Sequence, residues 1–442
     1  MPKPACSLSM TAAVVLVAGL AVEWMGGAQA NRGCTWKVRS IPRFTVAELS
    51  VERFVTEYVR PGLPVIIEQR RDDLPWSFES LAERCFADAR IPVARSGGRV
   101  SNARWARLEF MGDALLRDFA EKLRASDVDN RAGNGGTVAG ADVRYGFDLN
   151  LALECTALLE NFVLPPHFGE CALQRHYVHA MNGSQLPHPL SGRRSFSWPS
   201  LMMGQRGTRS ELHYDQAGLP FWMAVLRGRK LFRMMPFAYN LHLAGETYDY
   251  WKPWPMHRSA AENRFAEEIL GEYFDGGAYT FEAFDGPNFD GPNFAEFPQL
   301  CEATVSEAVV GPGDWIFIPT GAPHGAVNLD ATIAITSNYF SPSDDLASLA
   351  WFKRKCAQAS PDGVLMPPHI CAALLKAEAE AEPWAERKAR TFFEIAGFSG
   401  SAEWCAFQKA RIAEYPTSDA VRPRAAANFA RFCKQRSARA EL

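Results

Sequence analysis

The chain lacks the patterns that mark several common protein classes. None of its ten cysteines are spaced as Cys-x-x-Cys, so no zinc finger or zinc knuckle is predicted. No long basic run is present, and a net charge of −3 gives no electrostatic reason to expect direct binding to nucleic acid. A glycine-rich loop of the phosphate-cradling kind is also missing. What is present is 442 residues, 47% of them hydrophobic, enough for two domains or for one domain with substantial flanks.

The apolar run near the N-terminus is short. Thr11 to Val22 carries no charge over twelve residues and Glu23 ends it, whereas a membrane-spanning helix needs about 20 residues. The small-x-small pattern of residues 28–30 predicts cleavage after Ala30, so residues 1–30 are interpreted as a secretory signal. We therefore expect the secretory pathway, either the ER lumen or secretion, with a membrane anchor or an organelle-targeting leader as alternatives. In an oxidising compartment some cysteines would form disulfides, and otherwise they are expected to be buried thiols.

Residues 31–160 are predicted to form a mixed α/β flank. Val46 to Val59 has helical spacing, and the apolar stretch Val65 to Ile67 follows a proline- and glycine-containing break. Phe110 to Leu123 again carries apolar residues at helical intervals. Gly133 to Gly140 is rich in glycine and is predicted to be a flexible loop.

Residues 161–342 have a different pattern. From about residue 200, short β-rich runs alternate with turns, which predicts an antiparallel barrel or jelly roll. A long insertion, 239–300, has few strand signals and contains the repeat Asp285–Phe289 and Asp290–Phe294, so it is either a surface loop or a lid over the barrel mouth. The predicted strands are Phe221–Leu226, Lys230–Met235, Ala308–Val310, Trp315–Ile318 and Ala331–Ser337.

Residues 343–442 favour helix and are expected either to pack on the barrel or to make a homodimer contact. The fold class predicted for the whole chain is therefore mainly β with flanking helices: a double-stranded β-helix core between an α/β N-terminal flank and a helical C-terminal region. The predicted C-terminal helices are Leu346–Lys355, Ile370–Ala381, Pro383–Ile395, Glu403–Glu414 and Ala425–Gln435.

Three residues are candidates to bind one metal ion. His213 and Asp215 are two apart, so on a strand their side chains would point to the same face. His324, after a proline-containing turn, is the third candidate. Two histidines and one carboxylate leave part of an octahedral shell open, as in non-haem Fe(II) oxygenases, whereas a structural zinc site closes its shell. The alternative is that these are three unrelated core residues.

The spacing around these ligands resembles the two metal-binding motifs of the cupin superfamily. The first is the pair His213 and Asp215. The second has five positions at the expected spacing, and its last member follows the histidine by four residues. These positions are Gly313, Pro319, Gly321, His324 and Asn328.

The stretch from His213 to Met235 is similar to the JmjC-domain family of Fe(II)- and 2-oxoglutarate-dependent oxygenases. The most similar branch is the bifunctional arginine demethylase and lysyl-hydroxylase type, which has a tryptophan at the position of Trp222 and Gly-x-Lys at Gly228–Lys230. The segment Tyr145–Asp148 also resembles a Tyr-x-Phe-Asp turn of that branch. The resemblance extends from about residue 110 to residue 341.

The resemblance implies roles for further residues. Lys230 would bind the distal carboxylate of 2-oxoglutarate by a charge-assisted hydrogen bond; the alternative is a solvated surface lysine. Met223 stands where the branch has an asparagine near the co-substrate, and a thioether does not replace an amide donor. Four other positions match polar residues of the co-substrate pocket, with ordinary strand or turn residues as the alternative: Thr336, Ser210, Asn338 and Tyr145.

The resemblance implies an oxygenase that uses Fe(II), 2-oxoglutarate and O₂. It implies succinate, CO₂ and a hydroxylated side chain as products, or a demethylated one where an N-methyl group is hydroxylated. The family suggests a protein or peptide substrate with Lys or Arg as target, and a secretory signal argues against a histone. Two alternatives are a non-catalytic cupin-like binding protein and a metal-dependent cupin enzyme, such as an isomerase or dioxygenase, that does not use 2-oxoglutarate.

Overall fold

The structure is a computed structural model of the chain. Residues 35–442 form one compact unit. The predicted signal, residues 1–30, and the glycine-rich segment 133–140 lie outside the described residues. The residues that the structure describes are 37–69, 76–96, 108–131, 143–172, 174–175, 199–213, 215, 219–235, 280–281, 284–285, 291–292, 304–358, 371–372, 376–377, 381–414, 426–427 and 430–434.

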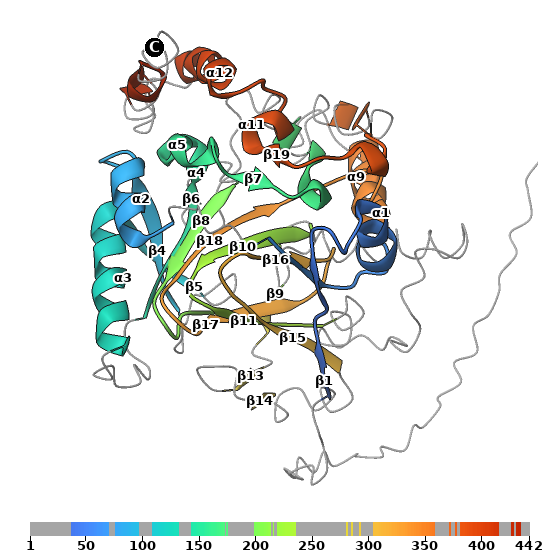
Figure 1. Cartoon of the computed structure of the whole chain (residues 1–442), viewed down its shortest axis with the longest axis horizontal. Coiled ribbons are helices and arrows are strands. Elements are labelled where there is room, and N and C mark those ends of the chain that lie inside the picture. The colour runs from blue at the N-terminus through green and yellow to red at the C-terminus, as the bar shows by residue number, and fades with distance from the viewer. Residues whose placement is uncertain are drawn as a thin grey trace, which may run out of the picture. The chain divides into compact units, whose positions relative to one another are not determined.

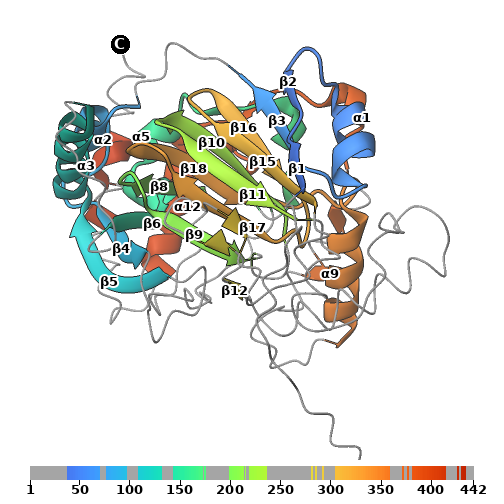
Figure 2. The ribbon, with the colours of Figure 1, turned by 90° about the horizontal axis from the view of Figure 1, so that it is seen from below.

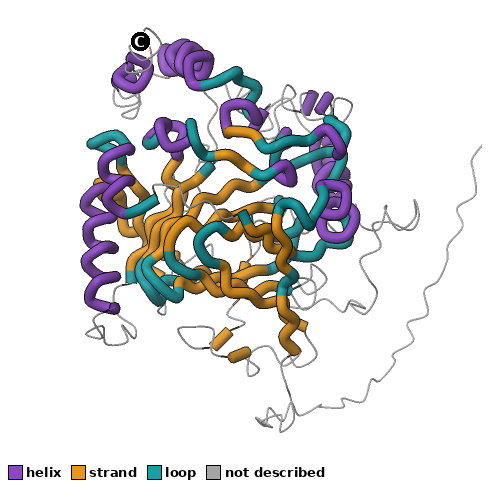
Figure 3. The backbone as a smooth tube through the Cα atoms, in the orientation of Figure 1, coloured by secondary structure: helices purple, strands orange, loops and turns teal. Residues whose placement is uncertain are grey.

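Two β-sheets form the centre of this unit, and helices flank them (Figures 1 and 3). One sheet has six strands in the order β1 (Lys37–Ser40), β15 (Thr304–Val310), β11 (Lys230–Met234), β17 (His324–Asn328), β9 (Arg209–His213) and β12 (Thr280–Phe281). The other has nine strands in the order β2 (Arg43–Thr45), β3 (Val65–Glu68), β16 (Asp314–Ile318), β10 (Phe221–Arg227), β18 (Thr332–Asn338), β8 (Ser200–Gly204), β6 (Arg144–Asn150), β4 (Arg90–Ser96) and β5 (Leu108–Leu115).

Eight of these strands have the connectivity of a double-stranded β-helix. In one sheet the order is β15-β11-β17-β9, in the other it is β16-β10-β18-β8, and all neighbours are antiparallel. The chain passes from one sheet to the other at almost every step, from β8 to β11 and from β15 to β18. The predicted jelly-roll core is confirmed, and strands β2 to β6 of the N-terminal flank extend the larger sheet.

Alternation along each strand separates two cores. The first lies between the sheets, where Phe221 and Met223 of β10 cluster with Phe232 and Met234 of β11. The second lies on the outer face of the larger sheet, where Trp222 of β10 packs against other aromatic rings. Because side chains of neighbouring residues point to opposite faces, β10 contributes residues to both cores. Its sequence is therefore continuously apolar instead of alternating.

The N-terminal flank differs from its predicted helices in two places. Residues 46–50 form a turn, and the helix begins only at α1 (Val51–Phe54), capped by Ser50, and ends in the π-helical turn η1 (Val55–Val59). The predicted helix from Phe110 to Leu123 is wrong in its first half, because β5 occupies that part. Only then does α3 (Leu116–Arg131) begin.

Helices cover two opposite ends of the larger sheet. Figures 1 and 2 show α2 (Phe78–Arg84) and α3 beside the β4–β5 end, and α1 and α9 (Leu346–Gln358) at the other end. Short helical elements lie between β6 and β8 in the sequence: α4 (Leu151–Glu154), α5 (Thr156–Leu159) and the 3-10 turn η2 (Pro166–Phe168), with the short strand β7 (Val163–Leu164) among them.

The C-terminal region packs on the barrel, one of its two predicted roles. Arg387 is buried and forms an ion pair with Glu170, and the two residues 390–391 pair with residues 163–164, so both contacts reach the segment 161–342. Whether the region also makes a dimer stays a prediction. The predicted helices at Leu346 and Glu403 are confirmed as α9 and as α12 (Ser401–Glu414).

The predicted helix over 383–395 is wrong for most of its length. It divides into the 3-10 turn η6 (Trp384–Glu386), the strand β19 (Arg390–Thr391) and α11 (Phe392–Ile395). Strand β19 pairs with β7, which is far away in the sequence, and because of this pairing Arg390 and Thr391 are extended instead of helical. Most residues of the predicted helix 370–381 lie outside the described residues. In the predicted helix 425–435 the described residues, 426–427 and 430–434, are helical.

Six cysteines in the described residues form three disulfides: Cys85–Cys155, Cys356–Cys371 and Cys405–Cys433. The alternative of buried thiols is therefore wrong for these six. No helix within the described ranges is long and apolar enough to cross a membrane.

The insertion is described only at three short strands. β12 pairs with β9 at the edge of the smaller sheet, with Thr280 directly opposite His213. β13 (Phe284–Asp285) and β14 (Gly291–Pro292), from the tandem repeat, pair with each other. The rest of 239–300 lies outside the described residues, so only residues 280–281 of the insertion are placed beside His213, and a role of the insertion as a lid stays a prediction.

Candidate metal centre

The two candidate histidine ligands face each other across a strand pair. His213 ends β9, His324 begins β17, and the ladder places them directly opposite, with their ring centroids 4.4 Å apart. Both are buried in the space between the two sheets. Directly opposite residues on antiparallel strands have side chains on the same face, so the pairing alone directs both imidazoles toward one point.

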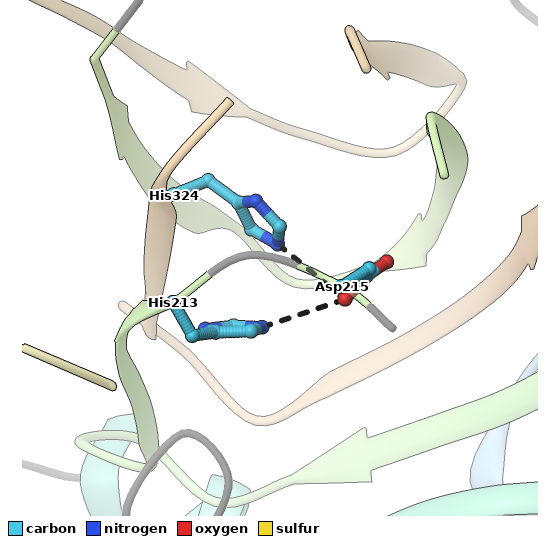
Figure 4. A group of neighbouring side chains, drawn as sticks. All are labelled: His213, Asp215 and His324. Atoms are coloured by element: carbon cyan, nitrogen blue, oxygen red, sulfur yellow. Dashed lines mark ion pairs between the residues drawn. The ribbon is translucent and has the colours of Figure 1, made fainter. Parts of the chain in front are cut away.

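Asp215 completes the cluster from the segment that follows β9. Its Oδ1 lies 3.7 Å from Nε2 of His213 and 4.0 Å from Nε2 of His324 (Figure 4). Figure 4 shows the three side chains converging on one small region. His213, Asp215 and His324 are the group of His, Cys, Asp or Glu side chains, among those the structure describes, with ligand atoms close enough to share one ion.

Backbone contacts orient both imidazoles for ligation. Nδ1 of His213 lies 2.6 Å from the carbonyl oxygen of Glu211, and Nδ1 of His324 lies 2.9 Å from that of Ala322. A carbonyl only accepts, so in each ring Nδ1–H donates and Nε2 keeps its lone pair. Both lone pairs are therefore on the nitrogens that face Asp215, as a metal ligand requires.

Burial determines the charge state of the cluster. It lowers the pKa of His213 to about 3, with the neighbouring His324 adding to the effect, and lowers the pKa of His324 to about 4. Both rings are therefore neutral at pH 7. Burial also raises the pKa of Asp215, because a carboxylate removed from water is less stable in its charged form. A divalent cation beside it would favour the charged form again.

The residues fit a divalent transition metal. Two neutral imidazoles and one carboxylate are the donor set of non-haem Fe(II) sites. Ligands that each lie about 2.1 Å from one ion are at most about 4.2 Å apart, and the separations of 3.7 and 4.0 Å fall within that reach. Three protein ligands leave coordination positions for other molecules.

Asn338 holds the carboxylate ligand in place. Its Nδ2 donates to Oδ2 of Asp215 at 2.7 Å, and it also contacts the carbonyl oxygen of Leu219 at 3.4 Å. The sequence placed Asn338 among the co-substrate residues, whereas in the structure its amide contacts the oxygen of Asp215 that faces away from the histidines.

Lys230 lies in the same barrel interior and is only 2% exposed. Its Nζ donates to Oδ1 of Asn328 at 2.6 Å and lies 5.3 Å from the ring centroid of Tyr145. Among the described residues no carboxylate pairs with it. Burial lowers its pKa to about 7. The alternative of a solvated surface lysine is therefore wrong.

Lys230 and the metal cluster share a strand pair. On the β11–β17 ladder Lys230 is opposite Asn328, and Met234 is opposite His324. The four-residue step from Lys230 to Met234 corresponds to about 13 Å along the strand. The side chains of Lys230 and His324 both extend into the barrel interior. A small elongated dianion would fit between such an ammonium and a metal ion.

Thr336 and Met223 are direct partners across β18 and β10. Both are buried, and Thr336 Oγ1 donates to the carbonyl of Trp222 at 2.8 Å, which leaves its lone pairs as acceptors. Met223 packs in the apolar cluster between the sheets. At this point the barrel interior is therefore lined by the thioether of Met223 beside the hydroxyl of Thr336.

Ser210 reaches the same face as His213 through a bulge. Residues three apart on a regular strand point to opposite faces. Here the register shifts, so that His213 is opposite His324 while Ser210 is opposite Ala326, which lines the interior. The predicted proximity of Ser210 to the site therefore depends on an irregularity that strand periodicity alone does not predict.

Three residues near Lys230 were not identified as site residues from the sequence. They are Asn328, which accepts from the ammonium group, and Thr208 and Gly204, which lie against the Asn328 amide. Only Asn328 had a signal, as the last position of the second motif, and nothing in the pattern linked it to Lys230.

Comparison with known proteins identifies relatives over most of this unit. A family model described as a cupin-like domain matches residues 51–345. The bifunctional arginine demethylase and lysyl-hydroxylase of Caenorhabditis briggsae is 22% identical over 308 residues, 68% of this chain and 62% of that protein. An arginine-specific demethylase of Arabidopsis thaliana is 24% identical over 340 residues, 76% of this chain and 54% of that protein. The chain thus spans less than two thirds of the length of these relatives.

Proposed function

The chain belongs to the cupin-like domain family, and from this membership we propose that it is an Fe(II)- and 2-oxoglutarate-dependent oxygenase that modifies protein side chains. Relatives named as arginine demethylases and lysyl-hydroxylases support this reaction class. The proposed target is a lysine or arginine side chain, with hydroxylation or oxidative demethylation as the outcome.

One observation carries the proposal: a three-ligand cluster and a buried lysine without a carboxylate partner in the described residues share one barrel interior. Leaving an ammonium buried without a counter-ion is costly, so such a group favours binding of an anion. A keto acid with a second carboxylate would offer one end to the metal and the other to Lys230.

Each part of this site has a defined task. His213, Asp215 and His324 would hold Fe(II), which when bound supplies the activation of O₂ coupled to decarboxylation of 2-oxoglutarate. Lys230 would bind the distal carboxylate, and Thr336 offers a hydroxyl on the opposite wall. The apolar residues around Met223 would exclude water from the reacting atoms.

We place this reaction in the secretory pathway. The short apolar leader at residues 11–22 and the small-x-small pattern before Asn31 support this location. So do the three disulfides, because such bonds persist mainly in oxidising compartments. The proposed substrates are therefore proteins that share that compartment.

A substrate experiment tests the proposed reaction. Full-length protein with Fe(II), 2-oxoglutarate and O₂ is incubated with secretory-pathway proteins, and lysine- and arginine-containing peptides are analysed by mass spectrometry. The expected result is the gain of one oxygen atom, or the loss of one methylene group, on specific side chains. Modification that is equal in an Asp215→Ala control would contradict the proposal.

Two alternatives make different predictions. A non-catalytic cupin-like protein would bind metal and ligand without consuming 2-oxoglutarate. A metal-dependent cupin enzyme that does not use 2-oxoglutarate would keep its activity in a Lys230→Ala variant and in the absence of the keto acid. The buried position of Lys230, beside Asn328 and Tyr145, favours the oxygenase.

A further inference from the structure

The acceptor that holds the Lys230 ammonium is a neutral amide. Asn328 Oδ1 accepts from Nζ at 2.6 Å, and both side chains are at most 2% exposed. A carboxylate at this position would neutralise the lysine, and the pair would attract no further anion. A carboxamide satisfies one N–H of the ammonium and leaves its net charge in place.

A chain of hydrogen bonds fixes which end of the Asn328 amide faces Lys230. Thr208 is 1% exposed, and its hydroxyl donates to the carbonyl of Gln205 at 2.8 Å. Its oxygen therefore accepts, and the donor is Nδ2 of Asn328. With Nδ2 held there, Oδ1 must face the ammonium. Two backbone bonds of 2.8 Å, from Asn328 N to Thr208 O and from Gly207 N to Asn328 O, hold the two segments together.

Gly204 provides the space that this chain of hydrogen bonds occupies. It lies on β8 directly opposite Tyr145 of β6. A Cβ atom there would lie within 3 Å of Asn328 Nδ2, Thr208 Oγ1 and a ring carbon of Tyr145. Any larger residue would displace the amide, the hydroxyl or the ring that contacts Lys230.

We propose that Asn328, Thr208 and Gly204 are positioning residues for the anion subsite: they hold the Lys230 ammonium with a neutral, oriented acceptor so that its charge remains available to the distal carboxylate of the co-substrate. This inference rests on the proposed function, because it assigns these residues to the recognition of 2-oxoglutarate. It predicts that they determine selectivity for a keto acid with a second carboxylate.

The test measures that selectivity directly. Full-length, metal-loaded protein is titrated without oxygen by calorimetry with 2-oxoglutarate and with 2-oxobutanoate, which has the same keto acid end but no distal carboxylate. Wild type is expected to prefer 2-oxoglutarate. Asn328→Asp places a carboxylate against Lys230 and should weaken 2-oxoglutarate binding on the order of 100-fold, with 2-oxobutanoate binding unchanged.

Two further variants keep the test decisive if Asn328→Asp folds poorly. Thr208→Val removes the acceptor of the Asn328 amide and should cost about tenfold in 2-oxoglutarate affinity, whereas Thr208→Ser keeps the hydroxyl and should restore it. Thr156→Val is the matched control, because its buried hydroxyl also donates to a backbone carbonyl, that of Ala152, outside the site. Gly204→Ala changes no polar atom and should also lower the preference for 2-oxoglutarate over 2-oxobutanoate.

The outcomes separate the two proposals. If wild type prefers 2-oxoglutarate but Asn328→Asp and Thr208→Val keep that preference, the positioning role is wrong and the proposed function stands. Equal weakening of both keto acids would also overturn the positioning role, since it would indicate a general loss of structure. If wild type and Lys230→Met bind 2-oxoglutarate equally poorly, the proposed function fails and the positioning role fails with it.

Discussion

The side-chain amide of Asn338 donates to Oδ2 of Asp215 at 2.7 Å, while Oδ1 of the same carboxylate faces His213 and His324. One oxygen is thus held by the protein and the other is directed at the ion that the histidines would share. The contact crosses from β18 to the segment after β9, and it fixes an aspartate that belongs to no strand. This arrangement favours ligation through a single oxygen.

Removal of this amide should weaken metal binding. Asn338→Ala leaves Asp215 free to rotate, and loss of such a contact typically lowers metal affinity about 10–100-fold. Calorimetric titration of the metal-free protein with Mn(II) or Fe(II) under anaerobic conditions measures the change. Ser337→Ala is the control, because this side chain is on the opposite face of β18 and contacts Gln174. Unchanged affinity in Asn338→Ala would show that the contact does not orient the ligand.

Binding of 2-oxoglutarate should be linked to uptake of a proton. Burial lowers the pKa of Lys230 to about 7 in the ligand-free protein, and a carboxylate beside the ammonium would raise it again. Above pH 7 the free lysine is mostly neutral, so binding requires protonation and affinity should fall about tenfold for each further pH unit.

Calorimetry of the metal-loaded protein in buffers with different ionisation enthalpies measures this uptake. At pH 8 we expect nearly one proton taken up per 2-oxoglutarate, and at pH 6 almost none. Lys230→Met is the control, and it should abolish the difference between the two pH values. The same proton count at pH 6 and pH 8 in wild type would disagree with this prediction.

The Cys85–Cys155 disulfide should contribute more to stability than the Cys356–Cys371 disulfide. It links the end of α2 to the start of α5 and closes a 70-residue loop, whereas the Cys356–Cys371 disulfide closes a 15-residue loop. Loop-closure entropy then predicts losses of about 4 and about 3 kcal/mol when each pair is changed to alanine. Urea denaturation of the two double variants measures this difference, and the reverse order would be evidence against the entropic account.

The sequence predicted the parts of the fold that depend on local pattern. The runs beginning at Phe221, Lys230 and Trp315 were placed within one or two residues of their strands, because each is a short apolar or alternating segment between turns. The three candidate metal ligands could be found because each lies in a short local motif: His213 and Asp215 lie two apart, and His324 follows a turn. The strand expected to carry both His213 and Asp215 ends at His213, so Asp215 reaches the cluster from the segment after β9.

Features that depend on long-range pairing could not be predicted in this way. Phe110 and Leu115 have helical spacing with Phe119, but pairing of β5 with β4 makes the first two part of a strand. The bulge that turns Ser210 inward is visible only once β17 pairs with β9. Likewise, the contact between Asn328 and Lys230 follows from their register across β11 and β17, which are 98 residues apart at this point.

The central claim is that one barrel interior holds a metal through His213, Asp215 and His324 and binds 2-oxoglutarate through Lys230. Its most direct test is the formation of succinate from 2-oxoglutarate by purified full-length protein with Fe(II), ascorbate and O₂, without added protein substrate. We expect succinate well above the level of a His213→Ala variant, and a level close to that variant in Lys230→Met. Wild-type succinate no higher than that of His213→Ala would contradict the claim.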